Sequence, residues 1–219
     1  MRMERTFSLQ EYTVTVLWDD PDAPALYTVS EGRAARALFG ALPGPRPSLV
    51  CIDGVDWDRD LSPWPAEKVF RGGADFSGGA EAFLQVLLQN ILPAAEENLS
   101  PAWRGIFGYS LAGLFSLWTM TKTDAFQRCA SVSGSLWFDG FTAYLSTHPL
   151  PGRPARVYLS LGDREDKAKN PRMQRVRTAT EAAKQILEAR DIPCAFELNP
   201  GGHFQDPAER QKKAVLALL

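Results

Sequence analysis

Histidine and cysteine are scarce in this sequence. Its 219 residues include two histidines, His148 and His203, and three cysteines, Cys51, Cys129 and Cys194. The cysteines are odd in number, far apart and each embedded in a short apolar run, which argues against a disulfide framework and indicates reduced, buried thiols in a cytoplasmic protein. Because there are only two histidines and they lie in unrelated contexts, we expect no metal site.

Long hydrophobic runs and clusters of like charge are also missing. No stretch approaches the roughly 18 apolar residues of a membrane span, and the N-terminus lacks the apolar core and cleavage site of a signal peptide. The net charge is −2, and no basic cluster has interleaved aromatic residues. Neither a nucleic acid nor a membrane is therefore an expected partner, whereas homo-oligomerisation is left open.

What the sequence does contain is an alternation of short apolar strands and longer helical patterns. We predict strands at 12–18, 25–30, 47–53, 104–110, 127–137, 157–162 and 194–200, and helices at 31–42, 80–99, 111–120, 170–192 and 206–219. The first two strands flank a turn-rich connector, which predicts an early hairpin. The alternation as a whole predicts one α/β domain, residues 1–219, with a mostly parallel sheet and helices on both faces.

The segment GIFGYSLAGLF (105–115) places Ser110 where a predicted strand meets a predicted helix. A nucleophilic serine occupies this position when a sharp turn raises its hydroxyl above the sheet and small neighbours let strand and helix approach. Gly108 and Ala112 are both small, although Ala112 stands where glycine is usual, and Gly113 follows one step late. Taken alone, the pattern also fits a serine that caps a buried helix.

Two further strand ends carry residues that would complete a catalytic triad. His203 follows the strand 194–200 in the loop GGHFQD, and three acids, Asp163, Glu165 and Asp166, follow the strand 157–162. One acid could accept the imidazole N–H and stabilise the imidazolium. The alternatives are a surface histidine and a solvated acidic loop.

The three elements occur in the chain order serine, acid, histidine, each just after a predicted strand. This order is typical of the α/β-hydrolase fold and differs from that of the two common serine-protease arrangements. An oxyanion hole should then combine the N–H of Leu111 with an N–H of Glu31 or Gly32, in the loop that enters the first helix. The loop at Gly54, one strand later, is the competing candidate.

The segments FGYSLAGLFSLW, SVSGSLWF, LSLGDRED and ELNPGGHF together resemble the esterase family that contains enterochelin (ferric-enterobactin) esterases and S-formylglutathione hydrolase. The resemblance is nearest to small bacterial members of the enterochelin-esterase branch. It implies an α/β-hydrolase fold, no cofactor, Ser110 as the nucleophile and His203 as the general base. It also implies Glu165 as the acid, in a G-x-x-E turn, with Asp163 as the alternative.

These features predict a serine carboxylic-ester hydrolase that acts on a small-molecule ester through an acyl-enzyme. A non-catalytic binding module of the same fold and an acyltransferase with the same triad are the rival hypotheses. Tyr109, Trp57, Trp64 and Trp137 are candidates for the substrate pocket, although the tryptophans could equally cover the edge of the sheet. Arg59 and Arg71 could meet an anionic substrate, but solvation at the surface is the better interpretation of both.

Overall fold

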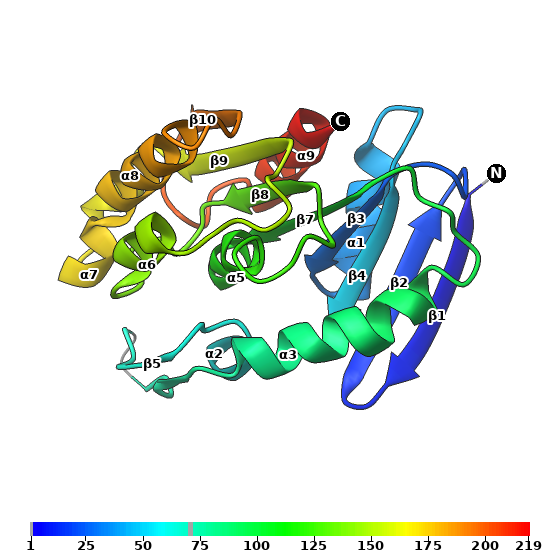
Figure 1. Cartoon of the computed structure of the whole chain (residues 1–219), viewed down its shortest axis with the longest axis horizontal. Helices are drawn as coiled ribbons and strands as arrows, with labels where there is room; N and C mark the ends of the chain where they lie inside the picture. Colours follow the sequence, from blue (N-terminus) through cyan, green and yellow to red (C-terminus); the bar gives the residue numbers. More distant parts are fainter. Residues whose placement is uncertain (1, 70–71) are drawn as a thin grey trace.

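A sheet of eight strands forms the centre of the molecule in the computed structural model, which describes residues 2–69 and 72–219 (Figure 1). The strand order is β1-β2-β4-β3-β7-β8-β9-β10. β2 pairs antiparallel with β1 and β4, and the other pairs are parallel. The predicted α/β-hydrolase arrangement of a mostly parallel sheet is thus confirmed. The strands are β1 (Met3–Leu9), β2 (Tyr12–Trp18), β3 (Ala25–Val29), β4 (Ser48–Asp53), β7 (Arg104–Tyr109), β8 (Arg128–Val132), β9 (Arg156–Gly162) and β10 (Cys194–Asn199), with a separate pair, β5 (Pro65–Ala66) and β6 (Phe76–Ser77).

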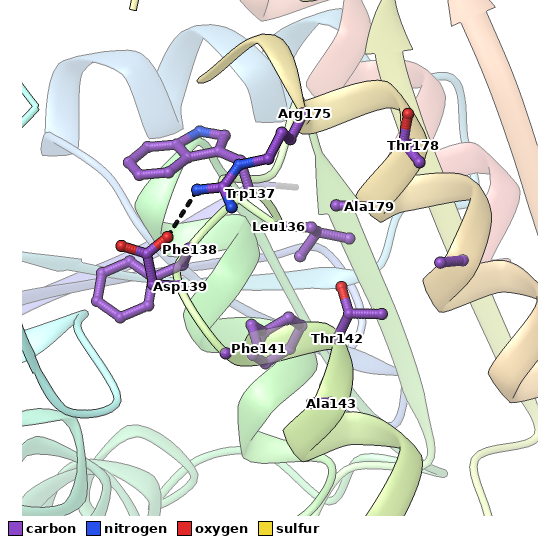
Figure 2. A pocket seen from close by; sticks show the side chains of 12 residues that line it. Leu136, Trp137, Phe138, Asp139, Phe141, Thr142, Ala143, Arg175, Thr178 and Ala179 are labelled. Carbon is purple, nitrogen blue, oxygen red and sulfur yellow. Dashed lines mark hydrogen bonds and ion pairs between the residues drawn. The ribbon is translucent and has the colours of Figure 1, made fainter. Parts of the chain in front are cut away.

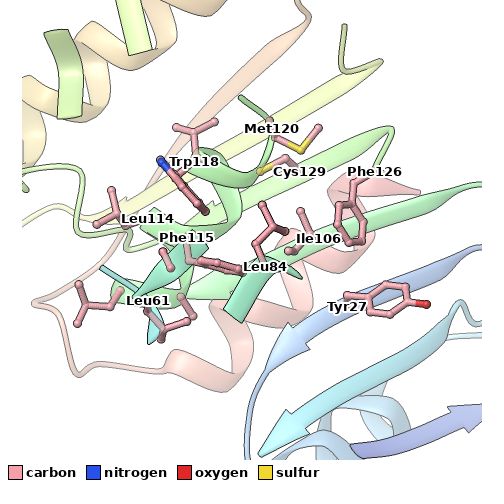
Figure 3. Packing of buried hydrophobic residues seen from close by; sticks show 14 of the residues in the cluster. Tyr27, Leu61, Leu84, Ile106, Leu114, Phe115, Trp118, Met120, Phe126 and Cys129 are labelled. Carbon is pink, nitrogen blue, oxygen red and sulfur yellow. The ribbon is translucent and has the colours of Figure 1, made fainter. Parts of the chain in front are cut away.

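Helices cover both faces of this sheet. Apolar side chains of α1 and α9 pack into one buried cluster, and those of α3, α5, α6 and α8 pack into a larger cluster on the other face. Figure 3 shows part of the larger cluster, to which Phe115 and Trp118 of α5 and Ile106 of β7 belong. The helices are α1 (Gly32–Ala41), α2 (Trp57–Asp60), α3 (Ala80–Val86), α4 (Leu92–Ala95), α5 (Leu111–Thr119), α6 (Phe141–Thr147), α7 (Pro171–Gln174), α8 (Val176–Glu188) and α9 (Pro207–Leu218), with a π turn η1 (Leu87–Ile91) and a 3-10 turn η2 (Glu165–Lys167).

The prediction that strands 12–18 and 25–30 pair as an early hairpin is wrong. β2 pairs with β1 through the two-residue turn Gln10-Glu11, and β3 lies instead between β4 and β7. Gln10 has a φ of 54°, a conformation that glycine or asparagine usually supplies in such turns. Because the turn contains neither glycine nor asparagine, nothing in the sequence indicated a hairpin here, and β1 was not predicted.

Three further elements differ from their predictions. The helix expected at 80–99 is interrupted by η1 and ends at Ala95, and Pro93 lies just after the interruption. Proline lacks an N–H and crowds the preceding turn, which is consistent with a wider turn at this point. The strand expected at 127–137 ends at Val132, and the helix expected at 170–192 divides into α7 and α8.

The cysteines lie mostly in the interior of the fold. Cys51 and Cys129 are buried, as expected, and Cys194 is half-buried. Burial raises the pKa of the Cys51 and Cys194 thiols, each to about 12, so neither thiol ionises at neutral pH.

Among the residues that the structure describes, none of the helices combines the length and the hydropathy that a membrane span needs.

Candidate active site

Ser110 lies at a sharp turn between β7 and α5. Its φ of 58° and ψ of −122° fall in a region that residues with a side chain seldom adopt. The backbone is held there from both sides, because the Ser110 N–H donates to the carbonyl of Val132 and the Ser110 carbonyl accepts from the N–H of Ser135, each at 3.0 Å. This is the strained strand-to-helix turn expected of a nucleophile elbow.

Small residues on β7 and α5 make this turn sterically feasible. A Cβ atom added to Gly108 would lie 2.3 Å from the Ala112 carbonyl carbon and 2.6 Å from the Ala112 Cβ. Ala112 itself is only 1% exposed, so its methyl group occupies the space left by the missing side chain of Gly108. The elbow thus accommodates alanine at 112 because position 108 is glycine.

Alanine at position 108 is expected to destabilise the protein by about 3 kcal/mol or more, since the added Cβ meets backbone atoms that cannot move aside. For a chain of this size the thermal midpoint should fall by about 6–12 °C. Gly40 offers a matched control: it is exposed near the end of α1 and a Cβ there meets nothing within 4 Å. Gly40→Ala should be neutral or stabilising by up to about 1 kcal/mol. Equal midpoints for the two variants would contradict this account.

The imidazole of His203 connects Ser110 to Glu165. Its Nε2 lies 3.1 Å from the Ser110 Oγ, and its Nδ1 lies 2.7 Å from the Glu165 Oε2. His203 comes from the loop between β10 and α9, and Glu165 comes from η2, directly after β9. The ends of three parallel strands therefore bring these side chains into one hydrogen-bonded chain, which has the geometry of a Ser–His–acid triad.

Asp163, the alternative acid, has a different contact. Its Oδ1 accepts from the backbone N–H of Gly201 at 2.8 Å, and about half of its side chain is exposed. Gly201 has a φ of 93°, in the left-handed region that glycine adopts readily. Asp163 thus supports the backbone of the loop that carries His203, whereas Glu165 contacts the imidazole.

Glu165 is a buried carboxylate with several donors. Its Oε1 accepts from the N–H of Gly162 at 2.6 Å and from the Arg210 guanidinium at 2.9 Å. Burial alone would raise the pKa of Glu165, but the hydrogen bonds from His203 and Gly162 outweigh it and leave that pKa below the usual value of 4.5. The group is therefore ionised at neutral pH, where it can stabilise a positive charge on the imidazole.

Two backbone segments are candidates for an oxyanion hole. Leu111 is the first residue of α5, so its N–H has no acceptor within the helix. β3 is the strand next to β7, and the loop Ser30–Gly32 follows β3, whereas Gly54 follows β4, one strand further away. The strand order is thus consistent with Glu31 or Gly32 as the second donor, which stays a prediction.

A cavity of about 240 Å³, the triad cavity, opens beside His203 and Glu165. Its walls include His203 and Glu165 together with the apolar side chains of Trp137, Met173 and Val176. Trp137 also lines a neighbouring groove of about 410 Å³ between α6 and α8, where Arg175 donates to Asp139 at 2.7 Å (Figure 2). The indole therefore lies between the triad cavity and this second groove.

Of the three tryptophans predicted for the substrate pocket, only Trp137 lines the cavity beside His203. Trp57 lies on the one-turn helix α2 and is 43% exposed. The Trp64 indole N–H donates to the Asp139 carbonyl at 3.0 Å, and its ring packs against Phe138 and Tyr144. Trp64 thus anchors its loop to the segment that begins α6, and it does not line the cavity beside His203.

Tyr109 and Arg59, two further candidates for contact with a substrate, have other contacts. The Tyr109 hydroxyl donates to the backbone carbonyl of His203, so it supports the histidine loop. The Arg59 guanidinium binds Asp60 at 2.6 and 3.0 Å. Arg71 lies outside the described residues. In the described part of the chain, no group of three or more His, Cys, Asp or Glu side chains is arranged to hold a metal ion.

Sequence reasoning missed three polar residues around the contacts of Ser110, His203 and Glu165. The Ser135 Oγ lies 3.4 Å from the Ser110 Oγ, and the Arg210 guanidinium donates to both Glu165 and Ser133. Ser133 and Ser135 belong to a segment that was expected to continue a strand. Arg210 is on α9, where burial recurs at Arg210, Ala214 and Leu218, and this spacing of four was the available signal.

The sheet order, the strained elbow and the Ser–His–Glu contacts define the α/β-hydrolase class. The sequence model of the family described as "Putative esterase" matches residues 32–206, and the chain belongs to this family. The resemblance seen in the sequence is thereby confirmed.

Comparisons with individual proteins agree with this placement. "Uncharacterized protein YbbA" of Bacillus subtilis (strain 168) is 30% identical over 150 residues, which are 65% of this chain and 60% of that protein's length. The solved structure of an IroE-like serine hydrolase from Shewanella oneidensis has a TM-score of 0.73 at 16% identity and covers 98% of this chain and 78% of its own. The enterobactin hydrolase IroE has a TM-score of 0.72 at 20% identity, with 99% and 94% covered. At such identities the structures establish the fold.

Proposed function

We propose that this protein is a serine carboxylic-ester hydrolase in which Ser110, His203 and Glu165 form the catalytic triad. The observation that carries the proposal is the hydrogen-bonded chain from the Ser110 Oγ through the imidazole to the Glu165 carboxylate, with distances of 3.1 and 2.7 Å. It starts at a strained elbow, where the hydroxyl lies at the N-terminus of α5. Membership of the esterase family supports the same reaction class.

In the proposed reaction, His203 Nε2 removes the proton of Ser110 as Oγ attacks the ester carbonyl. The tetrahedral intermediate carries its negative charge near the N–H of Leu111 and an N–H of the Ser30–Gly32 loop. When the carbon–oxygen ester bond breaks, the imidazolium returns the proton to the leaving alcohol. Water, deprotonated by the same imidazole, then hydrolyses the acyl-enzyme and regenerates the serine hydroxyl.

The cavity beside His203 indicates what part of a substrate it could hold. Trp137, Met173 and Val176 give it apolar walls, and the Phe204 ring, 84% exposed, lies 5.0 Å from the imidazole ring. At about 240 Å³ the cavity matches a small apolar or aromatic group. We therefore propose a small-molecule ester as substrate. Related structures are named for siderophores and for ferulic acid, so both ester types belong in a substrate screen.

Labelling with a fluorophosphonate tests the proposal, because it requires an activated serine next to a functioning histidine. We expect stoichiometric modification, mapped by peptide mass spectrometry to Ser110 and not to Ser135, whose hydroxyl lies 3.4 Å away. The labelled protein should hydrolyse none of a panel of p-nitrophenyl, acetyl-sugar, feruloyl and catecholate-lactone esters, at least one of which the free protein should cleave.

Other outcomes of the same experiment identify the rival functions. A folded protein that neither reacts with the fluorophosphonate nor cleaves any ester would be a binding module of this fold. If an added alcohol captured the acyl group in large excess over water, the protein would be an acyltransferase with the same triad.

A further inference from the structure

Arg210 is a charged side chain in the interior of the molecule. It is 2% exposed and lies on α9, which packs against β7, β8 and β9. Withdrawing a guanidinium from water is costly unless its donors are satisfied and its charge is balanced. The partners of Arg210 therefore indicate why it is buried.

These partners belong to three different loops around the triad. Arg210 Nη1 donates to the Glu165 Oε1 at 2.9 Å and to the Ser133 Oγ at 3.0 Å. Its Nη2 donates to the backbone carbonyls of Pro200 and Gly202, both at 2.9 Å. One planar group thus ties the loop after β8 to the acid loop after β9 and the histidine loop after β10.

The two oxygens of the Glu165 carboxylate have different hydrogen-bond partners. Arg210 and the Gly162 N–H occupy Oε1, so Oε2 faces the imidazole at 2.7 Å. The carbonyls of Pro200 and Gly202 bracket Gly201, two residues before His203. Arg210 therefore restrains both ends of the Glu165–His203 hydrogen bond.

We propose that Arg210 is a positioning residue that fixes the triad acid and the histidine loop, and that its charge offsets part of the Glu165 charge felt by the imidazole. This rests on the proposed function, in which His203 is the base. Arg210 contacts no reacting atom and acts through Glu165. A positive charge on the far side of the carboxylate makes protonation of the imidazole less favourable and keeps more of the base free as the pH falls.

Removing the Arg210 charge should shift the pH dependence of kcat/KM in a known direction. In Arg210→Met the imidazole faces an uncompensated carboxylate, so it binds a proton at higher pH, and the acidic limb of the kcat/KM profile should move up by about one pH unit. The other ionisable groups on the segments around His203 are unchanged in the variant: the Tyr109 hydroxyl from β7, Asp163, Arg164 and Lys167 from the acid loop, and Asp206 just before α9.

The kinetic test compares Arg210→Met, Arg210→Lys and Lys212→Ala. We expect Arg210→Met to lower kcat about a hundredfold, because the triad loses its alignment, with a change in KM of less than about threefold. Arg210→Lys keeps the positive charge but loses the planar guanidinium that donates to several acceptors at once. We therefore expect kcat to fall while the acidic limb of the kcat/KM profile keeps its position. Lys212, a part-exposed neighbour on α9 paired with Glu209, is the matched control and should behave like the parent protein.

Proton NMR provides a readout independent of turnover, since the protein has two histidines. The His203 ring signal, assigned by its loss in His203→Ala, should titrate at higher pH in Arg210→Met, while His148 stays unchanged as an internal standard. A folded Arg210→Met with the parent kcat, or with parent positions of both the acidic limb and the NMR midpoint, would overturn the proposal.

Two further outcomes are also decisive. If Arg210→Met does not fold, Arg210→Lys decides: a lowered kcat at an unshifted limb supports the proposal, and a parent kcat refutes it. If the parent protein itself cleaves no ester and takes no fluorophosphonate, the proposed function fails, whereas the NMR comparison still measures whether Arg210 is coupled to His203.

Discussion

Alanine in place of Ser110 or His203 is expected to lower kcat/KM for ester hydrolysis by at least about a thousandfold. Ser110 supplies the attacking oxygen and His203 the base that lies 3.1 Å from it, so the loss of either one leaves the other without its role. Steady-state kinetics on the best ester of the screen measures the effect. The circular dichroism spectrum should be unchanged, because neither side chain belongs to the buried apolar clusters.

The double variant Ser110→Ala/His203→Ala separates a shared mechanism from two independent effects. Residues that act as one unit are non-additive, so the double variant should be about as active as the weaker single variant. Its residual rate would come from the oxyanion hole and substrate binding. If Ser110→Ala kept the parent rate, or if the two losses multiplied, the triad assignment would be wrong.

Glutamine at position 165 is expected to lower kcat by about a thousandfold or more, whereas asparagine at position 163 should change it by less than about threefold. Glu165 is the ionised group that contacts the imidazole, at 2.7 Å. A neutral amide can neither stabilise the imidazolium nor balance the buried Arg210 charge. Asp163 contacts the Gly201 N–H, which an asparagine oxygen can also accept.

The comparison of these two variants distinguishes the two acids of the GDRED loop directly. Glu165→Asp serves as an intermediate case, since it retains the charge on a shorter side chain and should recover part of the lost rate. Thermal denaturation of each variant shows whether the fold persists. A larger loss in Asp163→Asn than in Glu165→Gln would reverse the assignment and make Glu165 a structural carboxylate.

The parts of the site that were predictable from sequence depend on local geometry or on the topology of a parallel sheet. Gly108, Ser110 and Ala112 lie within five residues, so their turn can be recognised without any distant contact. Glu165 and His203 are far apart in the chain, but each follows a strand. Parallel strands bring their carboxyl ends to one edge of a sheet, and this is why chain order predicted that the serine, one of three acids and the histidine would meet. The choice of Glu165 among those acids came from the family resemblance.

The parts that were not predictable depend on contacts between distant segments. Trp64 is held away from the triad cavity by a hydrogen bond to Asp139, 75 positions later. Arginine is usually exposed, and the spacing of four with Ala214 and Leu218 indicates only the buried face of α9. The partners of Arg210, Glu165 and Gly202, are identified only in the folded chain. The β1–β2 turn lacks the glycine or asparagine that announces such turns.

The order of elements along the chain has a consequence for biosynthesis. Arg210 follows Ser133, Glu165 and His203 in sequence, yet it holds the loops that carry them. During translation Glu165 therefore leaves the ribosome before the guanidinium that contacts its Oε1. The contacts around the proposed triad are therefore complete only after α9 has docked against the sheet.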